Sequence, residues 1–527
     1  MNIILNNVKF YYSDPYVPVF DNISLTIDTK WKAGLVGRNG AGKTTLLKLI
    51  TGELMPVCGS IHVPVSIRRF PYQIVDESMK VKNIIMDSIA PFDKWERKME
   101  ELAKKGDKSS LEEYGNLLEL YEQYDGYGIE SRIEKELFML YLDVSILNKK
   151  FCNLSGGEQT KIKILSLFLV EEEYPLIDEP TNHIDMQGRQ LIAKYLAEKE
   201  GFLLVSHDRY FLDLCTDHII SINKSDIKIN KGNYSQWKYN MDLEIEFEKR
   251  KDTNLKRKIK SLGRSTDRLK RWSFRIEKTK IGAGDKGAVG ASAARMMKRA
   301  KNVERRIKRN IEEKSKLLKN KEKSRSLKLK TEFITREILV SVSNLYIAYD
   351  QNVIIKDFSL ILRRGDRIAI TGRNGTGKTT LIKAILGYIK PQKGIIYKPS
   401  FVRFMSMRQV PKWNEKYLKD IIESRDVDLS QFRNVLASMG IKGDIFERPI
   451  STFSMGERKK VEMAFSFTEP ASVYVWDEPL NYVDVFSREQ IEEVILKYKP
   501  TMLFIEHDRY FIEKVATDVV DLDKYTQ

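Results

Sequence analysis

The segment LVGRNGAGKTTLLKLITG at residues 35–52 decides the fold, because a near copy of it, ITGRNGTGKTTLIKAILG, occupies residues 370–387. A second pair of similar segments, SHDRYF at 206–211 and EHDRYF at 506–511, follows in the same order. Such internal repetition indicates two homologous domains. The chain has 527 residues, which is too many for one hydrophobic core, so two domains also suit its length.

Both copies contain the pattern G-x-x-x-x-G-K-[ST], after an apolar strand-like run and before a helical one. Glycines let backbone N–H groups converge on phosphate oxygens, and the start of a helix adds positive potential. A glycine turn that merely precedes a helix is the alternative, and the repeated match in the same context disfavours it. The lysine is expected to reach the β- and γ-phosphates and the threonine to hold Mg²⁺: Lys43 and Thr44 in Gly37–Thr44, Lys378 and Thr379 in Gly372–Thr379.

Each domain also has an extended apolar run that ends in two carboxylates, YPLIDEPTNHID at 174–185 and VYVWDEPLNYVD at 473–484. The aspartate would lie beside the metal, and the glutamate would polarise the water that attacks the γ-phosphate. Acids that face solvent at the end of a strand are the alternative, which the phosphate loops disfavour. The residues concerned are Asp178 and Glu179 in the first domain and Asp477 and Glu478 in the second.

Two further segments, LSGGE at 154–158 and FSMGE at 453–457, resemble the signature motif of ATP-binding cassette domains. The resemblance covers essentially the whole chain. It implies an α/β fold with two P-loop cassette domains joined by a long α-helical hairpin linker. It also implies ATP hydrolysis with Mg²⁺ at two sites, each between the phosphate loop of one cassette and the signature of the other, in a monomer that forms an internal pseudo-dimer.

The resemblance also assigns residues to each site. Histidines and tyrosines taken singly are more often structural, but here their order and spacing recur in both halves. The catalytic residues implied are Glu179, Glu478, His207 and His507, and the metal ligands are Thr44, Gln73, Asp178, Thr379, Gln409 and Asp477. The nucleotide-binding residues implied are Tyr12, Gly37, Asn39, Gly40, Gly42, Lys43, Thr44, Thr45, Gln73, Ser155, Gly156, Gly157 and Glu158, and in the second copies Tyr349, Gly372, Asn374, Gly375, Gly377, Lys378, Thr379, Thr380, Gln409, Ser454, Met455, Gly456 and Glu457.

The sequence departs from the family pattern at three places, and the first two predict that the two sites are unequal. Met455 stands where the second signature position is usually glycine, and Leu480–Tyr482 (LNY) stand where the first cassette has TNH. Pro175 interrupts the first acidic run and is expected to shorten that strand or make it irregular, because proline cannot donate to a sheet ladder.

The net charge of +17 is concentrated in the middle of the chain. Residues 241–330 hold 31 Lys and Arg against 12 Asp and Glu, a surplus of 19, which leaves −2 for the remainder. Helical patterns at about 241–276 and 291–329 predict two antiparallel helices. The expected domains are a first cassette at 1–238 with a helical arm inserted at about 85–135, a basic hairpin at 239–337 with its tip at about 275–295, and a second cassette at 338–527.

The linker is expected to bind RNA. Its cations can neutralise phosphates, whereas its aromatic and methionine side chains either stack on bases or pack between the helices. A solvated coiled coil is the alternative, which the one-sided charge disfavours. The RNA-binding residues expected are Arg271, Trp272, Phe274, Arg295, Met296, Met297, Lys298, Arg299, Lys301, Arg305 and Arg306.

Twin cassettes on one chain, no apolar run long enough to cross a membrane and a charged linker resemble the F subfamily, which acts on ribosomes during translation. MMKRAKNVERR at 296–306 and WDEPLNYVD at 476–484 resemble the branch that protects ribosomes from antibiotics at the peptidyl-transferase centre. That resemblance implies pleuromutilin, lincosamide or streptogramin A drugs, ribosomal and transfer RNA as partners, neither membrane nor DNA, and a cytoplasmic location. A general translation factor, a transporter's energy subunit and a DNA-maintenance ATPase are the alternatives.

Overall fold

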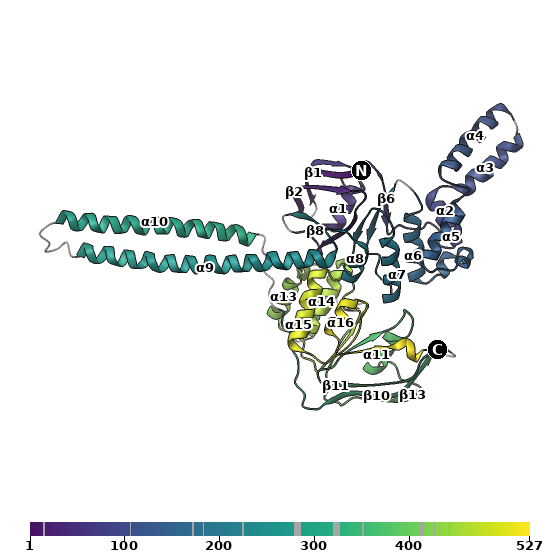
Figure 1. Ribbon diagram of the computed structural model, residues 1–527. Coiled ribbons are helices and arrows are strands. Elements are labelled where there is room, and N and C mark those ends of the chain that lie inside the picture. Colours follow the sequence, from purple (N-terminus) through teal and green to yellow (C-terminus); the bar gives the residue numbers. More distant parts are fainter. Residues whose placement is uncertain are drawn as a thin grey trace. The chain divides into compact units, whose positions relative to one another are not determined.

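The computed structural model describes residues 1–13, 16–105, 107–170, 173–182, 184–223, 226–278, 286–319, 327–349, 352–409, 413, 416–425, 427–441 and 443–526. The chain divides into two compact units (Figure 1). One unit holds Met1–Tyr234 and Arg325–Gln527 and contains both repeats, and the other holds Ser235–Ser324. The predicted α/β fold, two cassettes and a long helical linker, is confirmed.

The first cassette has two sheets. The antiparallel sheet has the order β2-β1-β4, with β1 (Asn2–Ser13), β2 (Tyr16–Asp28) and β4 (Cys58–His62). The other sheet has the order β5-β6-β7-β3-β8-β9 and is parallel except for β9. Its strands are β3 (Lys32–Gly37), β5 (Ser66–Phe70), β6 (Glu173–Asp178), β7 (Phe202–Val205), β8 (His218–Ile222) and β9 (Ile227–Lys231).

The helices of the first cassette are α1 (Lys43–Ile50), α2 (Val81–Ile89), α3 (Phe92–Lys105), α4 (Lys108–Gln123), α5 (Ile129–Met139), α6 (Gly156–Leu167), α7 (Met186–Ala197) and α8 (Arg209–Cys215). Two 3₁₀ turns, η1 (Val144–Asn148) and η2 (Phe151–Asn153), lead into α6. Helices α3 and α4 lie side by side (Figure 1). The Phe92 and Tyr121 rings meet edge to face between them, with 5.6 Å between the ring centroids. This pair lies within the segment expected as an inserted arm.

The second cassette repeats the plan. Its antiparallel sheet has the order β11-β10-β13, with β10 (Ile338–Tyr349), β11 (Asn352–Arg363) and β13 (Lys393–Tyr397). Its parallel sheet has the order β14-β15-β16-β12-β17, with β12 (Arg367–Thr371), β14 (Phe404–Met407), β15 (Val473–Asp477), β16 (Met502–Ile505) and β17 (Asp518–Asp521). The helices are α11 (Lys378–Leu386), α12 (Leu418–Ser424), α13 (Leu429–Ser438), α14 (Met455–Thr468), α15 (Val485–Tyr498) and α16 (Arg509–Val515), with 3₁₀ turns η3 (Gly443–Phe446), η4 (Ile450–Thr452) and η5 (Leu522–Tyr525).

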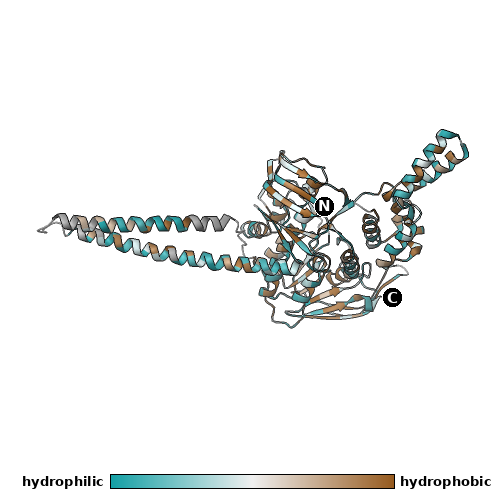
Figure 2. Cartoon of the chain, turned by 45° about the horizontal axis from the view of Figure 1, so that its top comes forward, coloured by the Kyte–Doolittle hydropathy of each residue, from teal (hydrophilic) through white to brown (hydrophobic). Residues whose placement is uncertain are grey.

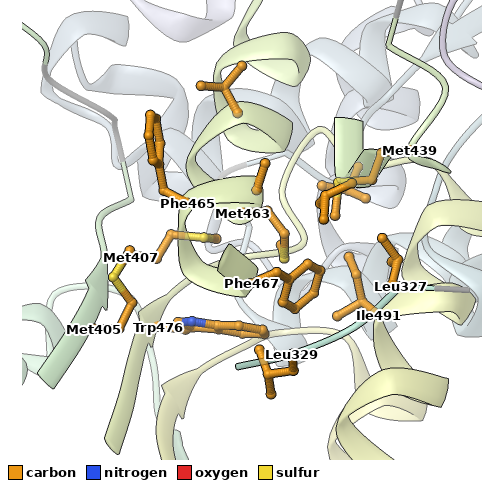
Figure 3. Packing of buried hydrophobic residues seen from close by; sticks show 14 of the residues in the cluster. Leu327, Leu329, Met405, Met407, Met439, Met463, Phe465, Phe467, Trp476 and Ile491 are labelled. Atoms are coloured by element: carbon orange, nitrogen blue, oxygen red, sulfur yellow. The ribbon is translucent and has the colours of Figure 1, made fainter. Parts of the chain in front are cut away.

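A buried cluster fixes α14 to the sheet of the second cassette (Figure 3). Trp476 on β15 and Phe465 on α14 are fully buried, and the Trp476 Nε1–H donates to Ser466 Oγ at 2.9 Å. Continuous apolar strands such as VYVW are typical of parallel sheets covered on both faces. This packing matters for function because α14 begins at the signature motif and β15 ends at Asp477.

Pro175 does not shorten its strand, so that prediction was wrong. β6 spans six residues and β15 five, and Pro175 pairs with Arg68 on β5. Pro175 affects only the pairing of β6 with β7, on the opposite edge of β6 from β5. That ladder begins at Leu176. At the position that corresponds to Pro175, counting back from Asp477, the Tyr474 N–H donates to Thr501 O, a bond that proline cannot make.

The linker consists of α9 (Tyr234–Lys278) and α10 (Lys286–Lys319), which run side by side and antiparallel (Figures 1 and 2). Lys270 and Glu304 form an ion pair between them, with 2.5 Å between Nζ and Oε1. At 1.5 Å per residue, the 45 residues of α9 extend about 68 Å. Residues 279–285, which belong to the predicted tip, lie outside the described residues.

The predicted second helix does not reach Leu329: α10 is described as far as Lys319, residues 320–326 lie outside the described residues, and residues 327–330 are not helical. Leu327 and Leu329 are instead buried in the core of the second cassette, and Leu329 lies beside Trp476 (Figure 3). The Lys330 N–H donates to Phe467 O and the Tyr474 hydroxyl donates to Lys330 O. The apolar residues that continued the helical pattern therefore serve the cassette core.

Candidate active sites

Each phosphate loop joins a central parallel strand to a helix, β3 to α1 and β12 to α11. The glycine before each lysine, Gly42 or Gly377, has a left-handed φ, 100° and 88°. A Cβ atom at Gly42 would lie 2.6 Å from Val19 Cγ1, and one at Gly377 would lie 2.3 Å from Ile354 Cγ2. Only glycine suits both the conformation and the space, so the loop backbone stays open to a ligand.

The lysine of each loop is buried and folds back on its own loop. Its Nζ donates to the carbonyl oxygens of the first two loop residues, at 2.8 and 3.2 Å for Lys43 and at 2.7 Å each for Lys378. Burial lowers the pKa of both lysines. An ammonium group held at the loop by neutral carbonyls can turn to a phosphate oxygen.

The second site has an oxygen-donor pair that fits Mg²⁺. The Thr379 hydroxyl donates to Asp477 Oδ2 at 3.0 Å, which brings two hard oxygen donors together at the end of β15. Asp477 Oδ1 is buried and has no hydrogen-bond partner in the described part of the chain. Burial raises the pKa of Asp477 to about 6, although the Thr379 hydroxyl opposes the shift. A bound cation would compensate the negative charge of this buried carboxylate.

The corresponding groups of the first site are arranged differently. Thr44 is exposed, and Asp178 Oδ2 lies 3.9 Å from Arg69 Nη2. Burial raises the pKa of Asp178, and the nearby Arg69 and Lys43 oppose the rise. Asp178 at the end of β6 and Thr44 after the phosphate loop still offer a carboxylate and a hydroxyl oxygen. The first site therefore has the same kinds of oxygen ligand as the second.

A glutamate follows each aspartate in a strained backbone conformation. Glu179 has φ 51° and Glu478 has φ 48°, and each backbone N–H donates to the end of the neighbouring strand, to Val205 O or Ile505 O. Non-glycine residues in this region are uncommon and tend to occur at functional sites. The histidines face these acids: His207 Nε2 lies 3.5 Å from Glu179 Oε1, and His507 Nε2 lies 3.7 Å from Glu478 Oε1.

The two glutamates differ in their partners. Glu478 Oε2 accepts from Gln409 Nε2 at 2.9 Å and from Asn481 Nδ2 at 2.5 Å. Gln73 is exposed, and among the described residues its side chain makes no hydrogen bond to Glu179. Of the two predicted glutamines, only Gln409 therefore contacts the glutamate of its own site.

The pKa values of the two glutamates differ accordingly. Burial and the neighbouring Asp178 raise the pKa of Glu179 to about 7. Burial alone would raise the pKa of Glu478 as well, but His507, the Gln409 amide and the nearby Lys459 charge outweigh it and lower the pKa to about 2. The departures of the sequence from the family pattern predicted that the two sites are unequal. In the structure, the two glutamates and their hydrogen-bond partners differ between the sites.

The first phosphate loop meets the second cassette. The Asn39 backbone N–H donates to Asp484 Oδ2 at 3.4 Å, and Asn39 Nδ2 donates to Tyr482 O at 2.9 Å. A Cβ at Gly456, in the second signature, would lie 3.2 Å from Asn39 Nδ2. The first loop and the second signature are thus neighbours. Asn39 Oδ1 is also 3.2 Å from His207 Nε2, which ties the loop to the histidine of its own cassette.

The second phosphate loop meets the first cassette in the related way. The Asn374 N–H donates to Asp185 Oδ2 at 3.3 Å, the counterpart of the Asn39–Asp484 bond. A pocket of about 340 Å³ lies here, lined by Ile184 and Arg189 of the first cassette and by residues of the second that include Asn374, Gly375, Gly377, Lys378, Thr379, Thr380, Gln409, Glu478, Asn481 and His507. Most of the lining residues from the second cassette are residues that the sequence predicted for the second site.

The signature serines start helices. Ser155 and Ser454 are N-caps of α6 and α14, each in a capping box with the glutamate three residues later, Glu158 or Glu457. Gly156 and Gly157 have open space around an added Cβ as far as the described residues reach. Both tyrosines expected at a base are partly exposed, Tyr12 at 40% and Tyr349 at 50%.

Sequence reasoning missed several residues that link the cassettes. Asp185 and Asp484 occur at the same place in both acidic motifs, and this repetition could have revealed them. A buried ion network was not foreseeable: Arg209 of the first cassette contacts Glu492 and Asp508 of the second. No local sequence pattern distinguishes these charges from surface ones.

The linker residues expected to bind RNA are placed as follows. The seven predicted cations and the two predicted aromatics are exposed, Trp272 at 51% and Phe274 at 60%, whereas Met296 and Met297 are half-buried. The exposed cations are Arg271, Arg295, Lys298, Arg299, Lys301, Arg305 and Arg306.

Two phosphate loops, each with a strained acid, a facing histidine and a partner cassette, define a twin-cassette nucleoside triphosphatase. The family model described as "ABC transporter" matches residues 20–182 and 355–481, more than half of the chain, and the chain belongs to this family. It is therefore an ATP hydrolase with two cassette domains.

Several curated relatives span nearly the whole chain. "Ribosome protection protein VmlR" of Bacillus subtilis is 27% identical over 98% of this chain and 85% of its own length. "Energy-dependent translational throttle protein EttA" of Mycobacterium tuberculosis is 26% identical over 95% and 88%. "ABC transporter F family member 5" of Arabidopsis thaliana is 26% identical over 98% and 74%.

A solved structure shares the tandem-cassette fold. It is the complex of archaeal ribosomal stalk protein aP1 with archaeal ribosome recycling factor aABCE1, with a TM-score of 0.56 and 20% identity over 98% of this chain and 87% of that one. Among the described residues, no helix is long and apolar enough to cross a bilayer.

Proposed function

We propose that this chain is an F-subfamily ATPase that binds the ribosome in its ATP-bound, closed form. In this state its linker lies against ribosomal and transfer RNA with its tip towards the peptidyl-transferase centre, where it displaces antibiotics. One observation carries the proposal: nucleotide sites shared by two cassettes are joined to a helical pair whose exposed charged side chains are mainly cationic. The proposed site of action is the cytoplasm.

The proposed roles are the same in both sites. Backbone N–H groups and the loop lysine bind the phosphates, and the signature of the opposite cassette completes the site. The glutamate orients and polarises the attacking water, and the histidine facing it fixes the geometry. Mg²⁺ would be held by the loop threonine, the strand-end aspartate and the glutamine, and it would supply positive charge to the reacting phosphate. The residues are those predicted in each copy, with Glu179 and His207 in the first site and Glu478 and His507 in the second.

Hydrolysis supplies the release step. A γ-phosphate bound by both cassettes favours the closed form, and its loss removes those contacts. Asn39 and Asn374 already touch the opposite cassette, so the loops lie where a change at the phosphate reaches the partner. The closed form would then open and leave the ribosome.

The linker supplies the RNA affinity. A surplus of 19 positive charges over residues 241–330 favours a polyanion, and phosphate contacts by exposed lysine and arginine are the main source of such affinity. Trp272 and Phe274 are exposed enough to stack on bases. Displacement of drugs of the pleuromutilin, lincosamide or streptogramin A type belongs to this proposal by resemblance. A general translation factor without drug displacement is the second candidate, because one relative of similar identity is named a translational throttle protein.

The coupling of nucleotide to ribosome binding is tested with the E179Q/E478Q variant. Ribosomes are pelleted through sucrose with the variant and ATP, and with ADP as the control. We expect at least about tenfold more bound protein with ATP, because the variant keeps the γ-phosphate that closes the cassettes. Equal binding with ATP, ADP and no nucleotide would contradict the proposal. Duplex DNA at the same salt concentration tests whether binding is merely charge-driven.

The drug-protection role is tested by deleting residues 282–290. We expect the deletion to abolish protection of an expressing strain against the three drug types while kcat for ATP hydrolysis stays within about twofold, because the deleted segment lies outside both cassettes. Susceptibility is measured as the minimal inhibitory concentration, and ATPase with purified protein. If neither the intact chain nor the deletion variant protects the strain from the drugs, the result would support the translation-factor alternative. Unchanged protection by the deletion variant would exclude a tip-based mechanism.

A further inference from the structure

A lysine is fully buried directly behind the second site. Lys459 lies on α14, five residues after the signature serine, and is 0% exposed. Its Nζ donates to Arg408 O at 2.6 Å and to Asp477 O at 3.4 Å. A buried ammonium is costly unless it is paired and hydrogen-bonded. The groups that satisfy this one are the backbones at the ends of β14 and β15, where the second site is built.

One helical turn further along α14, Glu462 contacts the same loop. Its Oε1 accepts from the Arg408 backbone N–H at 3.2 Å. Lys459 and Glu462 therefore hold both polar groups of one peptide residue, the C=O through the lysine and the N–H through the glutamate. The two side chains also attract each other, since each opposes the pKa shift that burial causes in the other.

The residue held in this way directly precedes Gln409. Gln409 follows the end of β14 after this single residue, and its amide donates to Glu478 Oε2 at 2.9 Å. Fixing the backbone of Arg408 therefore fixes the starting point of the side chain that touches the proposed base. The chain of contacts runs from α14 through Arg408 and Gln409 to Glu478, and each link is a hydrogen bond or a covalent bond.

In the described part of the first cassette, the corresponding positions make different contacts. Thr160 and Lys163 occupy the positions five and eight residues after the signature serine. The Thr160 hydroxyl donates to Gly156 O in its own helix, and Lys163 lies over the Phe151 ring at 5.5 Å. Gln73 follows β5 after two residues instead of one, is exposed, and has no hydrogen bond to Glu179 in the part that the structure describes.

We propose that Lys459 and Glu462 are positioning residues that hold the glutamine loop of the second site against Glu478, and that hydrolysis there depends on a pair which the first site does not have. Lys459 and Glu462 act through Gln409 and do not touch the nucleotide. The inference rests on the proposed role of Glu478 as the residue that orients water. It does not involve the ribosome, so its test uses purified protein alone.

The test compares one substitution in two backgrounds. Lys459→Met keeps the length and apolar stem of the side chain but removes the ammonium. In the E179Q background, where only the second site retains its acid, we expect K459M to lower kcat about tenfold or more with a smaller change in KM, because misplacement of a positioning contact acts on the reacting geometry. In the E478Q background the same substitution is expected to change kcat by less than about twofold. Equal losses in both backgrounds, or no loss in E179Q, would overturn the proposal.

Two further variants separate positioning from stability. Glu462→Gln keeps an oxygen acceptor for the Arg408 N–H and is expected to retain more activity than Glu462→Met. K459M added to Q409A should cause no additional fall in kcat, because the positioned side chain is already absent. A further fall in the double variant would assign Lys459 a merely structural role.

Hydrogen exchange gives a readout that does not depend on the two sites working independently. In the otherwise unaltered chain, K459M is expected to speed amide exchange in a peptide covering residues 404–409, because the loop loses one of its two anchors, while a peptide covering residues 66–73 keeps its rate. Faster exchange in both peptides indicates general loosening, and unchanged exchange in residues 404–409 shows that the loop is not held by Lys459. Either result would contradict the proposal.

Discussion

The E179Q/E478Q variant is expected to hydrolyse ATP with kcat lowered by about 10²- to 10⁴-fold, the usual size of a lost general base. Glutamine keeps the volume and the hydrogen-bonding oxygen of each side chain but cannot take a proton. Both acids lie at strand ends in a left-handed conformation beside a histidine, and neither supports the core, so the variant should fold normally. Phosphate release at saturating ATP measures the effect.

The matched control for this variant is Glu513→Gln, an exposed acid on α16 that pairs with Arg509. Its kcat should stay within about twofold of the unaltered chain. The two single variants are informative because the pKa values of Glu179 and Glu478 move in opposite directions. If the double variant keeps more than about a tenth of the original kcat, these glutamates are not the residues that activate water.

Arg209→Met is expected to lower the free energy of unfolding of the cassette pair by about 3–5 kcal/mol, the cost of removing one cation from a buried ion network. Arg209 donates through Nη2 to Glu492, and the same atom lies 3.4 Å from Asp508 Oδ1. Lys514 and Arg488 complete the network with bonds of 3.0 Å to Glu492 and 2.9 Å to Asp508. Urea or thermal unfolding followed by far-ultraviolet circular dichroism measures the loss.

Internal repetition supplies the control for this variant. Arg509 occupies the corresponding position in the second cassette, is 45% exposed at its side chain, and pairs with Glu513 and with the Tyr210 hydroxyl. Arg509→Met is expected to cost at most about 1 kcal/mol. In the first cassette Ala193 stands eight residues after Asp185, where the second cassette has Glu492 eight residues after Asp484, so Arg509 has no acid at the position equivalent to Glu492. The Arg189–Asp208 pair of the first cassette does correspond to the Arg488–Asp508 pair of the second. Equal losses for the two arginines would show that the network does not stabilise the interface.

The double variant R209M/E492M tests the pairing itself. R209M leaves the buried Glu492 carboxylate with Lys514 but without its second cation, and the double variant removes that carboxylate. The double variant should therefore be more stable than R209M alone. Additive losses would mean that Arg209 contributes through packing and not through the ion pair.

Much of the fold could be predicted because the motifs fix the backbone locally. A left-handed glycine before a lysine and a helix N-terminus forms the phosphate loop wherever the sequence places it, and the apolar run before Asp477 could only be a strand covered on both sides. The pairing of loop and signature across the cassettes came from family resemblance. The residues Asn39 and Gly456 lie close together, as that resemblance implies.

Other features depend on contacts that no local pattern carries. The end of the second linker helix was placed too late because Leu327 and Leu329 continue an apolar pattern, yet they are buried by Trp476 and its neighbours, distant in sequence. The consequences of Pro175 were misjudged because only one of its two neighbouring strands needs its missing N–H. The unequal environments of Glu179 and Glu478 follow from side chains on other elements, such as Gln409 and Lys459, that the motifs themselves do not specify.

The burial of Leu327 and Leu329 also sets where the second cassette can be cut free. A fragment that starts at residue 338, where the repeat becomes recognisable, would lose both leucines together with the bonds of Lys330 to Phe467 and Tyr474. Two vacated leucine sites in a close-packed interior cost several kcal/mol, about half of a domain's usual margin. A gene for the second cassette alone should therefore begin upstream of residue 327. A chimaera that contains the second cassette should include residues 327–337 for the same reason.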